Sequence, residues 1–176
     1  NLYLKVLRKF KNGYHSIISL ITFCEIHDLI NIIKTKYTKD KIIFSGEFKR
    51  GINNNTNTIT KLLKLLRKKN LIKNQFFKIH IIKNIPHGSG LGGGSANAAN
   101  LLNILNKKMN FKLKKREIVK IASQIGFDVP ACLEKKNSLL IGKSNNILRI
   151  KKNFRLNLLI VYPNIICSTS RIYNKN

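Results

Sequence analysis

The sequence predicts an α+β protein whose first part is rich in strands. Three observations favour this class: short β-branched or alternating apolar runs near the start, leucines at helical spacing further on, and a glycine-rich stretch between a strand pattern and a helix pattern. Half of the ten glycines lie in that stretch, residues 86–99. A length of 176 residues with 43% hydrophobic residues is sufficient for one domain, or for one domain and part of another.

Strands are predicted wherever a short run is β-branched or alternates apolar and polar residues. These runs cover residues 1–8, 16–24, 28–36, 41–46, 76–84, 139–142, 147–150 and 156–162. Helices are predicted where apolar residues recur at helical spacing, and these cover residues 59–69, 96–105 and 115–125. Asn12-Gly13 predicts a turn between the first two strands, and Gly126 is expected to end the last helix as a C-terminal glycine typically does. A connector at 106–114 and a loop from Pro163 complete the chain.

The charge is strongly positive, with 34 Lys and Arg against 7 Asp and Glu, which gives a net charge of +27. Lys, Asn and Ile are abundant from end to end, so a compositional bias towards A/T-rich codons explains the charge better than a selected basic surface. Polyanion binding stays open as the alternative. No apolar run is long enough to span a membrane. Cys24, Cys132 and Cys167 form no disulfide or zinc pattern, which favours a reducing, cytoplasmic compartment.

The glycine stretch, residues 86–99, predicts a phosphate site. Glycines let backbone N–H groups come close to a ligand, and the start of the following helix adds a partial positive charge. A Walker loop is excluded because Gly94-Ser95-Ala96 contains no Lys. A dinucleotide-binding fingerprint is disfavoured because the next acid, Glu117, lies too far along the chain. A flexible linker would not explain the regular elements on both sides.

One of the seven acids stands out as a candidate for catalysis. Asp28 begins a predicted strand, Asp40 and Glu47 lie among lysines near turns and are expected to be solvated, and Glu117 occupies the first turn of a helix. Asp128 instead follows a helix end, between two apolar residues and just before a proline. An acid in such surroundings is costly unless it has a partner or a task. The residues alone leave Asp128 open between a general base and a structural turn acid.

Two separate motifs resemble the GHMP small-molecule kinases. The pattern Pro-x-Gly-x-Gly-Leu-Gly-Gly-Gly-Ser-Ala-Asn-Ala-Ala over residues 86–99 is similar to the ATP loop of that family, and Gly-x-Asp-Val-Pro over residues 126–130 is similar to its catalytic-base motif. Residues 1–4, 13–15 and 169–173 resemble segments of the branch that acts on 4-diphosphocytidyl-2-C-methyl-D-erythritol. The resemblance spans essentially the whole chain.

The resemblance implies a fold and a reaction. Residues 1–150 would form a GHMP kinase N-terminal ATP-binding domain (ribosomal protein S5 domain 2-like), and residues 151–176 would begin a truncated C-terminal α+β domain. The reaction would be phosphorylation of the 2-hydroxyl of 4-diphosphocytidyl-2-C-methyl-D-erythritol by ATP with Mg²⁺, in the non-mevalonate route to isoprenoid precursors. The expected partners are therefore these small molecules, with no specific nucleic acid and no membrane.

The resemblance also assigns roles to residues. Asp128 would be the catalytic base, and Ser95 is a candidate Mg²⁺ ligand. ATP would be bound by Pro86, His87, Gly88, Ser89, Gly90, Leu91, Gly92, Gly93, Gly94, Ser95 and Ala96, with Asn57 and Lys83 near the adenine. The second substrate would be bound by Asn1, Tyr14, His15, Thr169 and Tyr173, where the two tyrosines stack on cytosine and His15 hydrogen-bonds its edge. Without the resemblance, Tyr14 and His15 would be ordinary hairpin or surface residues.

The chain departs from the family pattern in ways that matter. A catalytic Lys two residues before the position of Asn1, and a third glycine-rich motif after Tyr173, would lie outside this chain, so the chain is expected to be a fragment lacking both ends. Ala96 stands where Ser is usual, and Tyr173 where Phe is usual. Two alternatives stay open: another GHMP kinase, acting on homoserine or mevalonate, and a basic RNA-binding domain of the S5 type.

Overall fold

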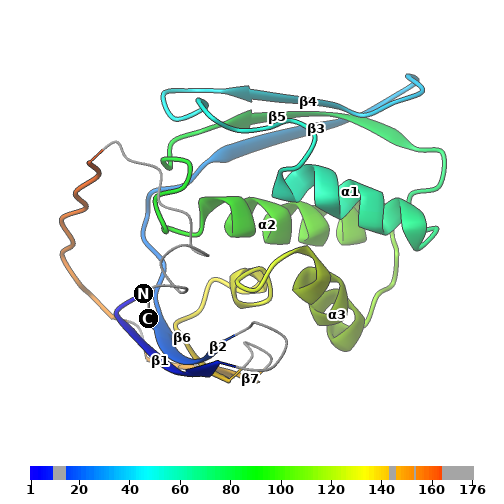
Figure 1. The fold of residues 1–176 in the computed structure, drawn as a ribbon. Coiled ribbons are helices and arrows are strands. Elements are labelled where there is room, and N and C mark those ends of the chain that lie inside the picture. The colour runs from blue at the N-terminus through cyan, green and yellow to red at the C-terminus, as the bar shows by residue number, and fades with distance from the viewer. Residues whose placement is uncertain (10–14, 143–145, 153, 164–176) are drawn as a thin grey trace.

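Two sheets with helices between them make up the fold (Figure 1). The computed structural model describes residues 1–9, 15–142, 146–152 and 154–163. One sheet has the order β3-β5-β4 and the other the order β1-β2-β6-β7. The strands are β1 (Tyr3–Lys9), β2 (His15–Ile21), β3 (Leu29–Thr35), β4 (Lys41–Ser45), β5 (Phe76–Ile82), β6 (Ser138–Gly142) and β7 (Asn146–Arg149). The helices are α1 (Thr58–Lys68), α2 (Gly93–Lys108), α3 (Lys115–Ile125) and the short 3₁₀ helix η1 (Ala131–Leu133).

The main core lies between the three-stranded sheet and the helices. Strand β5 is central in that sheet, antiparallel to β3 and parallel to β4, and alternate side chains of β5 point to the helices. Most fully buried side chains of this core come from α1, β5 and α2, and they include Leu62, Leu66, Ile79, Ile81 and Leu101. Because seven residues of α2 are buried, the loop that precedes it is attached to a helix packed into the core.

The four-stranded sheet is antiparallel throughout. Its interior-facing residues, such as Ile17 and Leu140, are buried. The edge strand β1 exposes Tyr3, Leu4 and Leu7 by 43% to 50% of their surface. The two sheets therefore differ: the first is covered by helices, and the second leaves apolar side chains of its edge strand open.

The predicted α+β class is confirmed, and every predicted helix is present. The helix predicted over 96–105 is longer, because it starts inside the glycine run at Gly93 and continues to Lys108. Its two terminal lysines are favoured there by the helix dipole. Helix α3 ends at Gly126 as expected, but with an extended φ of −174° instead of a left-handed cap.

Three strand predictions and one charge prediction need correction. The strand predicted over 16–24 starts at His15 and ends at Ile21. The strand predicted over 156–162 is wrong: these residues form no strand, and Leu159 and Val161 are 91% and 80% exposed. Apolar alternation is not enough for a strand without a neighbouring strand to pair with, and no pairing of this segment occurs in the described part of the chain. The strand predicted over 76–84 stops at Ile82. The Lys83 N–H still donates to the Ser45 carbonyl of β4, but the N–H groups of Asn84 and Ile85 turn towards a side chain described below.

Asp40 is the charge that was predicted wrongly, since it is not a solvated surface acid. Arg67 donates from both guanidinium nitrogens to its two carboxylate oxygens, at 3.0 and 3.3 Å, and the Phe77 N–H donates to it at 3.0 Å. Glu47 is exposed as expected, and Glu117 accepts from the Lys114 N–H at the start of α3. The Asn12-Gly13 turn lies outside the described residues, and the domain boundary after residue 150 stays a prediction.

Candidate active site

A cavity of about 1020 Å³ opens between the glycine stretch and the four-stranded sheet. Its floor is the inner face of β1, β2 and β6, and its walls are the start of α1, the stretch before α2 and the turn after α3. Among the residues predicted for the site, those that line it are Asn1, His15, Asn57, Lys83, Pro86, His87, Gly88, Ser89, Gly90, Leu91, Gly92, Gly93, Gly94, Ser95 and Asp128. Ala96 is not part of the lining, and Tyr14, Thr169 and Tyr173 lie outside the described residues.

The glycine stretch is a tight loop that leads directly into α2. Gly88, Gly90 and Gly92 all have φ between 72° and 77°, in the left-handed region that favours glycine. A side chain at Gly90 or Gly92 would project into open space, because no atom lies within 4 Å of the Cβ position. The loop therefore presents bare backbone, with the N-terminus of α2 behind it, which is the arrangement that binds phosphate.

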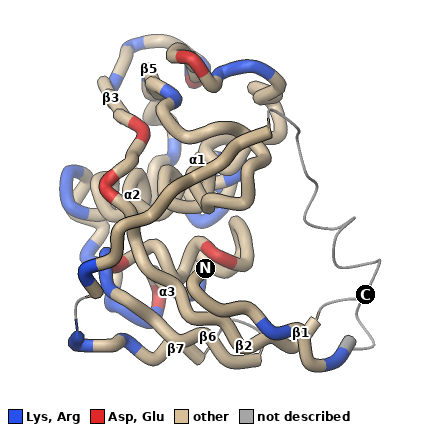
Figure 2. The backbone as a smooth tube through the Cα atoms, turned by 90° about the vertical axis from the view of Figure 1, so that its left-hand side faces the viewer, with Lys and Arg blue, Asp and Glu red and all other residues tan. Residues whose placement is uncertain are grey.

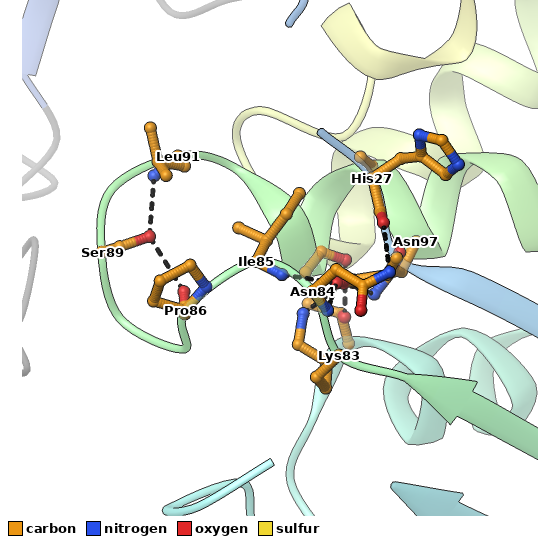
Figure 3. A network of polar contacts seen from close by, with 12 residues as sticks. His27, Lys83, Asn84, Ile85, Pro86, Ser89, Leu91 and Asn97 are labelled. Atoms are coloured by element: carbon orange, nitrogen blue, oxygen red, sulfur yellow. Dashed lines mark hydrogen bonds and ion pairs between the residues drawn. The ribbon is translucent and has the colours of Figure 1, made fainter. Parts of the chain in front are cut away.

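Polar side chains stabilise this loop from within. The Ser89 hydroxyl donates to the Pro86 carbonyl at 2.9 Å and accepts from the Leu91 N–H at 3.4 Å (Figure 3). The Thr58 hydroxyl, in the first turn of α1, donates to the Gly94 carbonyl at 2.8 Å. Ser95 lies in the first turn of α2 and lines the cavity. The Ser89 hydroxyl is thus used to close the loop, while Ser95 is placed to meet a ligand.

Asn57 has a structural task as well as a place in the cavity wall. It is the N-cap of α1, and its side-chain oxygen accepts from the Thr60 N–H at 2.9 Å. Its side-chain nitrogen donates to the carbonyls of Asn53 and Asn54. A ligand in the cavity therefore meets an amide whose orientation is already determined by the protein.

The loop begins above a buried polar network that the sequence analysis did not find. The Asp28 carboxylate is fully buried and forms an ion pair with Lys83, whose side chain is 5% exposed. The backbone N–H groups of Asn84 and Ile85 and the side-chain amide of Asn97 also donate to Asp28, at 2.8, 2.9 and 2.7 Å (Figure 3). Burial alone would raise the pKa of Asp28, but the hydrogen bonds from Lys83, Asn97 and Ile85 outweigh it and lower the pKa.

The sequence carried a weak signal for this network. Asn97 lies on the buried face of α2 among alanines and leucines, where a polar residue needs a partner. An aspartate immediately before an apolar strand could have been that partner, but nothing in the spacing indicates that two segments 69 residues apart meet.

Asp128 differs from Asp28 because no hydrogen bond to its carboxylate is found within the described ranges. It lies in the turn between α3 and η1, and its side chain opens into the cavity. Asp128 is exposed to the cavity, but the protein atoms packed around it partly desolvate the carboxylate, and this raises the pKa of Asp128 above its ordinary value. A carboxylate with a raised pKa that faces a cavity, and that accepts no hydrogen bond from the described residues, can accept a proton from a ligand.

Arg149 of β7 holds the turn that carries Asp128. Its guanidinium donates to the carbonyls of Ala131 and Pro130, at 2.7 and 3.1 Å, and to the Ser138 hydroxyl at 2.9 Å. The Cys132 N–H donates to the Asp128 carbonyl at 3.3 Å. The position of Asp128 is therefore determined by backbone contacts, which leaves its carboxylate available.

Among the described residues there is neither a metal-binding cluster nor a membrane-spanning helix. They contain no group of three or more His, Cys, Asp or Glu side chains placed to hold a metal ion. Within the same ranges, no helix is long and apolar enough to cross a membrane. Cys24 and Cys132 are free thiols, and Cys167 lies outside the described ranges. The cytoplasmic location stays a prediction.

The chain is similar to known kinases in sequence. The family model described as "GHMP kinases N terminal domain" matches residues 57–136. The 4-diphosphocytidyl-2-C-methyl-D-erythritol kinase of Pelagibacter ubique (strain HTCC1062) is 44% identical over 99% of this chain and 61% of its own length. The enzyme of the same name from Petrotoga mobilis (strain DSM 10674 / SJ95) is 38% identical over 99% of this chain and 65% of its own length. The chain thus spans about three fifths of the length of these curated relatives.

Two solved structures resemble the fold. A 4-(cytidine 5'-diphospho)-2C-methyl-D-erythritol kinase matches with a TM-score of 0.67 and 23% identity, over 85% of this chain and 52% of its own. A homoserine kinase from Cytophaga hutchinsonii matches with a TM-score of 0.59 and 16% identity, over 77% of this chain and 45% of its own. At these identities the likeness concerns the fold alone.

Proposed function

We propose that this chain is part of a GHMP kinase and that its protein phosphorylates the 2-hydroxyl of 4-diphosphocytidyl-2-C-methyl-D-erythritol with ATP. One observation supports the proposal: the glycine loop and Asp128, whose pKa is raised and whose carboxylate accepts no hydrogen bond from the described residues, line the same ligand-sized cavity. The curated relatives that align along nearly the whole chain carry this activity in their names. The reaction would belong to the non-mevalonate route to isoprenoid precursors.

We propose that the loop and the start of α2 bind the triphosphate. The left-handed glycines at 88, 90 and 92 expose backbone N–H groups, and the cavity leaves room beside Gly90 and Gly92. Asn57 and Lys83 line the same wall, and we place the adenine near them. Phosphoryl transfer depends chiefly on positioning and on neutralising charge, so a rigid loop on a buried helix is a suitable support.

We propose that Asp128 is the base that accepts the proton of the substrate hydroxyl. The hydroxyl oxygen forms a bond to the γ-phosphorus while the bond from that phosphorus to the bridging oxygen breaks, and ADP leaves. The hydroxyl proton passes to the Asp128 carboxylate, whose raised pKa favours this transfer. No hydrogen bond to this carboxylate from the described residues has to break first.

The donor set fits a Mg²⁺ ion that arrives with the nucleotide better than a resident one. Ser95 offers one hydroxyl at the start of α2, and the described residues offer no carboxylate cluster. Mg²⁺ in such sites is held largely by phosphate oxygens and water. We therefore propose Ser95 as the protein ligand; the ion, when bound, would neutralise phosphate charge.

For the second substrate, we propose contacts at the other end of the cavity. His15 and Asn1 line it from β2 and from the segment before β1, which supports roles in binding the cytosine edge and the methylerythritol hydroxyls. Tyr14, Thr169 and Tyr173 are proposed from the family resemblance alone, the tyrosines as the two faces of a cytosine sandwich.

The test is a substrate panel assayed with the natural full-length polypeptide and ATP. We expect phosphorylation of the cytidyl compound and none of homoserine or mevalonate. Phosphorylation of either of those alcohols alone would show that the protein is a different GHMP kinase. RNA binding is the remaining alternative, but Lys and Arg are spread over many elements instead of one face (Figure 2), so we expect any RNA binding to disappear at moderate salt.

A further inference from the structure

Asp28 connects three segments that meet beneath the glycine loop. It stands immediately before β3, and its donors are the Lys83 ammonium, the N–H groups of Asn84 and Ile85, and the Asn97 amide (Figure 3). Four donors on one fully buried carboxylate satisfy nearly all of its accepting capacity. Asp28 is therefore not available to a ligand, and any effect on function has to act through its partners.

Those partners are the two ends of the loop. Asn84 and Ile85 are the residues directly before Pro86, where the loop starts, and Asn97 lies two residues after Ser95, in α2. Because residues at both ends of the loop donate hydrogen bonds to one carboxylate, the distance between the two ends of the loop is fixed. A loop whose ends are fixed in this way needs less ordering when a ligand binds.

The ion pair also determines what the cavity presents to an anion. Lys83 lines the cavity but is almost fully buried, and its ammonium is paired with Asp28. Without Asp28, an unpaired ammonium would remain in the interior, which is strongly unfavourable. Without Lys83, an unpaired carboxylate would lie beneath the site where the phosphates are proposed to bind.

We propose that Asp28 is a positioning residue for nucleotide binding, which holds both ends of the glycine loop in the shape that receives the phosphates without touching the nucleotide. The inference rests on the proposed function only in taking ATP as the ligand. The alternative is that Asp28 contributes to folding stability and nothing more.

Asp40 provides a control because it binds the start of β5, while Asp28 binds the residues just after the end of β5. Asp40 also pairs with a cation, Arg67, and accepts a backbone N–H, that of Phe77 at the start of β5. Asp28 binds the N–H groups just after β5 ends. Asp28→Asn and Asp40→Asn thus make the same chemical change at the two ends of β5, and only the first lies beside the loop.

The experiment measures affinity for a non-hydrolysable ATP analogue by calorimetric titration of the natural full-length polypeptide. We expect Asp28→Asn to raise the Kd at least about tenfold and Asp40→Asn to leave it within about twofold of the wild type, although both lower the melting temperature. Amide hydrogen exchange over residues 84–92 should become faster in the first variant only.

An ATP-analogue Kd for Asp28→Asn within about twofold of the wild type, or an equal rise in Asp40→Asn, overturns the inference. Should Asp28→Asn fail to fold, Asn97→Ala carries the test, because it removes one donor and keeps the ion pair; we expect a Kd raised about threefold, and an unchanged Kd overturns the inference. The titration needs no second substrate. Failure to phosphorylate the cytidyl compound with intact, Asp28-dependent ATP binding therefore refutes only the proposed substrate.

Discussion

Two aspartates near the same cavity have opposite surroundings. Asp28 is fully buried with four hydrogen-bond donors, and its pKa is lowered. Asp128 faces the cavity, has no hydrogen-bond donor to its carboxylate in the described part of the chain, and its pKa is raised. The first carboxylate lies beneath the loop wall, and the second lies on the wall formed by the turn after α3.

The difference shows how the protein separates structure from chemistry. The carboxylate of Asp28 is fully used by its partners, and it links β3, the end of β5 and α2. The turn of Asp128 is instead held through its backbone carbonyls by Arg149, so that holding the residue does not use its carboxylate. A group that must accept a proton is positioned by its main chain, and a group that must hold a loop is positioned and used by its side chain.

The largest expected effects are those of two separate single substitutions, one at each aspartate. Asp128→Asn should lower kcat by about 10²–10⁴-fold, as expected for loss of a general base, with ATP-analogue binding and melting temperature little changed. Asp28→Asn should do the reverse, with weakened ATP binding and a lower melting temperature. Steady-state kinetics and thermal melts of both variants check this. A kcat for Asp128→Asn within a few-fold of the wild type would contradict the assignment of the base.

The second effect concerns Gly46, which packs against the backbone of Lys83. A Cβ at Gly46 would lie 2.7 Å from the Lys83 carbonyl oxygen and 2.9 Å from its nitrogen, and φ is +88°. We expect Gly46→Ala to destabilise the fold by about 2–4 kcal/mol and to weaken ATP binding by displacing the segment that Asp28 holds. Denaturant unfolding measures the first effect, and titration the second.

Gly142 is the matched control for this change. Its φ is +77°, but no atom lies within 4 Å of its Cβ position, and it belongs to the other sheet. Gly142→Ala should therefore show only the backbone cost of about 1–2 kcal/mol, with ATP binding intact. Equal losses for the two variants would mean that the contact with Lys83 is unimportant.

The third prediction concerns the turn between α3 and η1, which carries Asp128 and forms one wall of the cavity. Arg149→Lys keeps the charge but cannot reach the carbonyls of Pro130 and Ala131 and the Ser138 hydroxyl together. We expect kcat to fall about tenfold, because the base is displaced, while ATP-analogue affinity stays within about twofold. A loss of ATP affinity without loss of kcat would show that Arg149 does not act through the turn.

Much of the site could be predicted from the sequence because its signals are local. The glycine loop, the helix behind it and Asp128 each belong to a contiguous pattern, and the structure places all three around one cavity. Asp28 and Arg149 could not be found in this way, because their partners are distant in sequence: Asp28 meets Asn97 69 residues later, and Arg149 meets Pro130 and Ala131. Such contacts depend on tertiary packing, for which a single sequence carries no periodic signal.

The strand ends illustrate the same limit. Sequence continuity predicts that β5 runs to residue 84, but the N–H groups of Asn84 and Ile85 bind Asp28 and leave the ladder. The apolar run at 156–162 forms no strand although its alternation is clear. In both cases the outcome depends on the partner of the backbone and not on the residues themselves.

The smallest expected effect is a difference in pH dependence between activity, which depends on Asp128, and stability, which depends partly on Asp28. The folded-state pKa of Asp128 lies above the ordinary 3.8, so the acid limb of kcat/KM should begin at a higher pH than an ordinary aspartate would give. The folded-state pKa of Asp28 lies below 3.8, so its contribution to stability is complete above the unfolded value and is lost only as the pH falls through the lower, folded one. On acidification from about pH 7 to about pH 3, activity should therefore decline before the melting temperature loses the Asp28 contribution. Rate profiles of the wild type and melting curves of the wild type and Asp28→Asn measure the two events. If the difference in melting temperature between the wild type and Asp28→Asn disappeared before activity declined, the opposite environments of the two carboxylates would not be what distinguishes them.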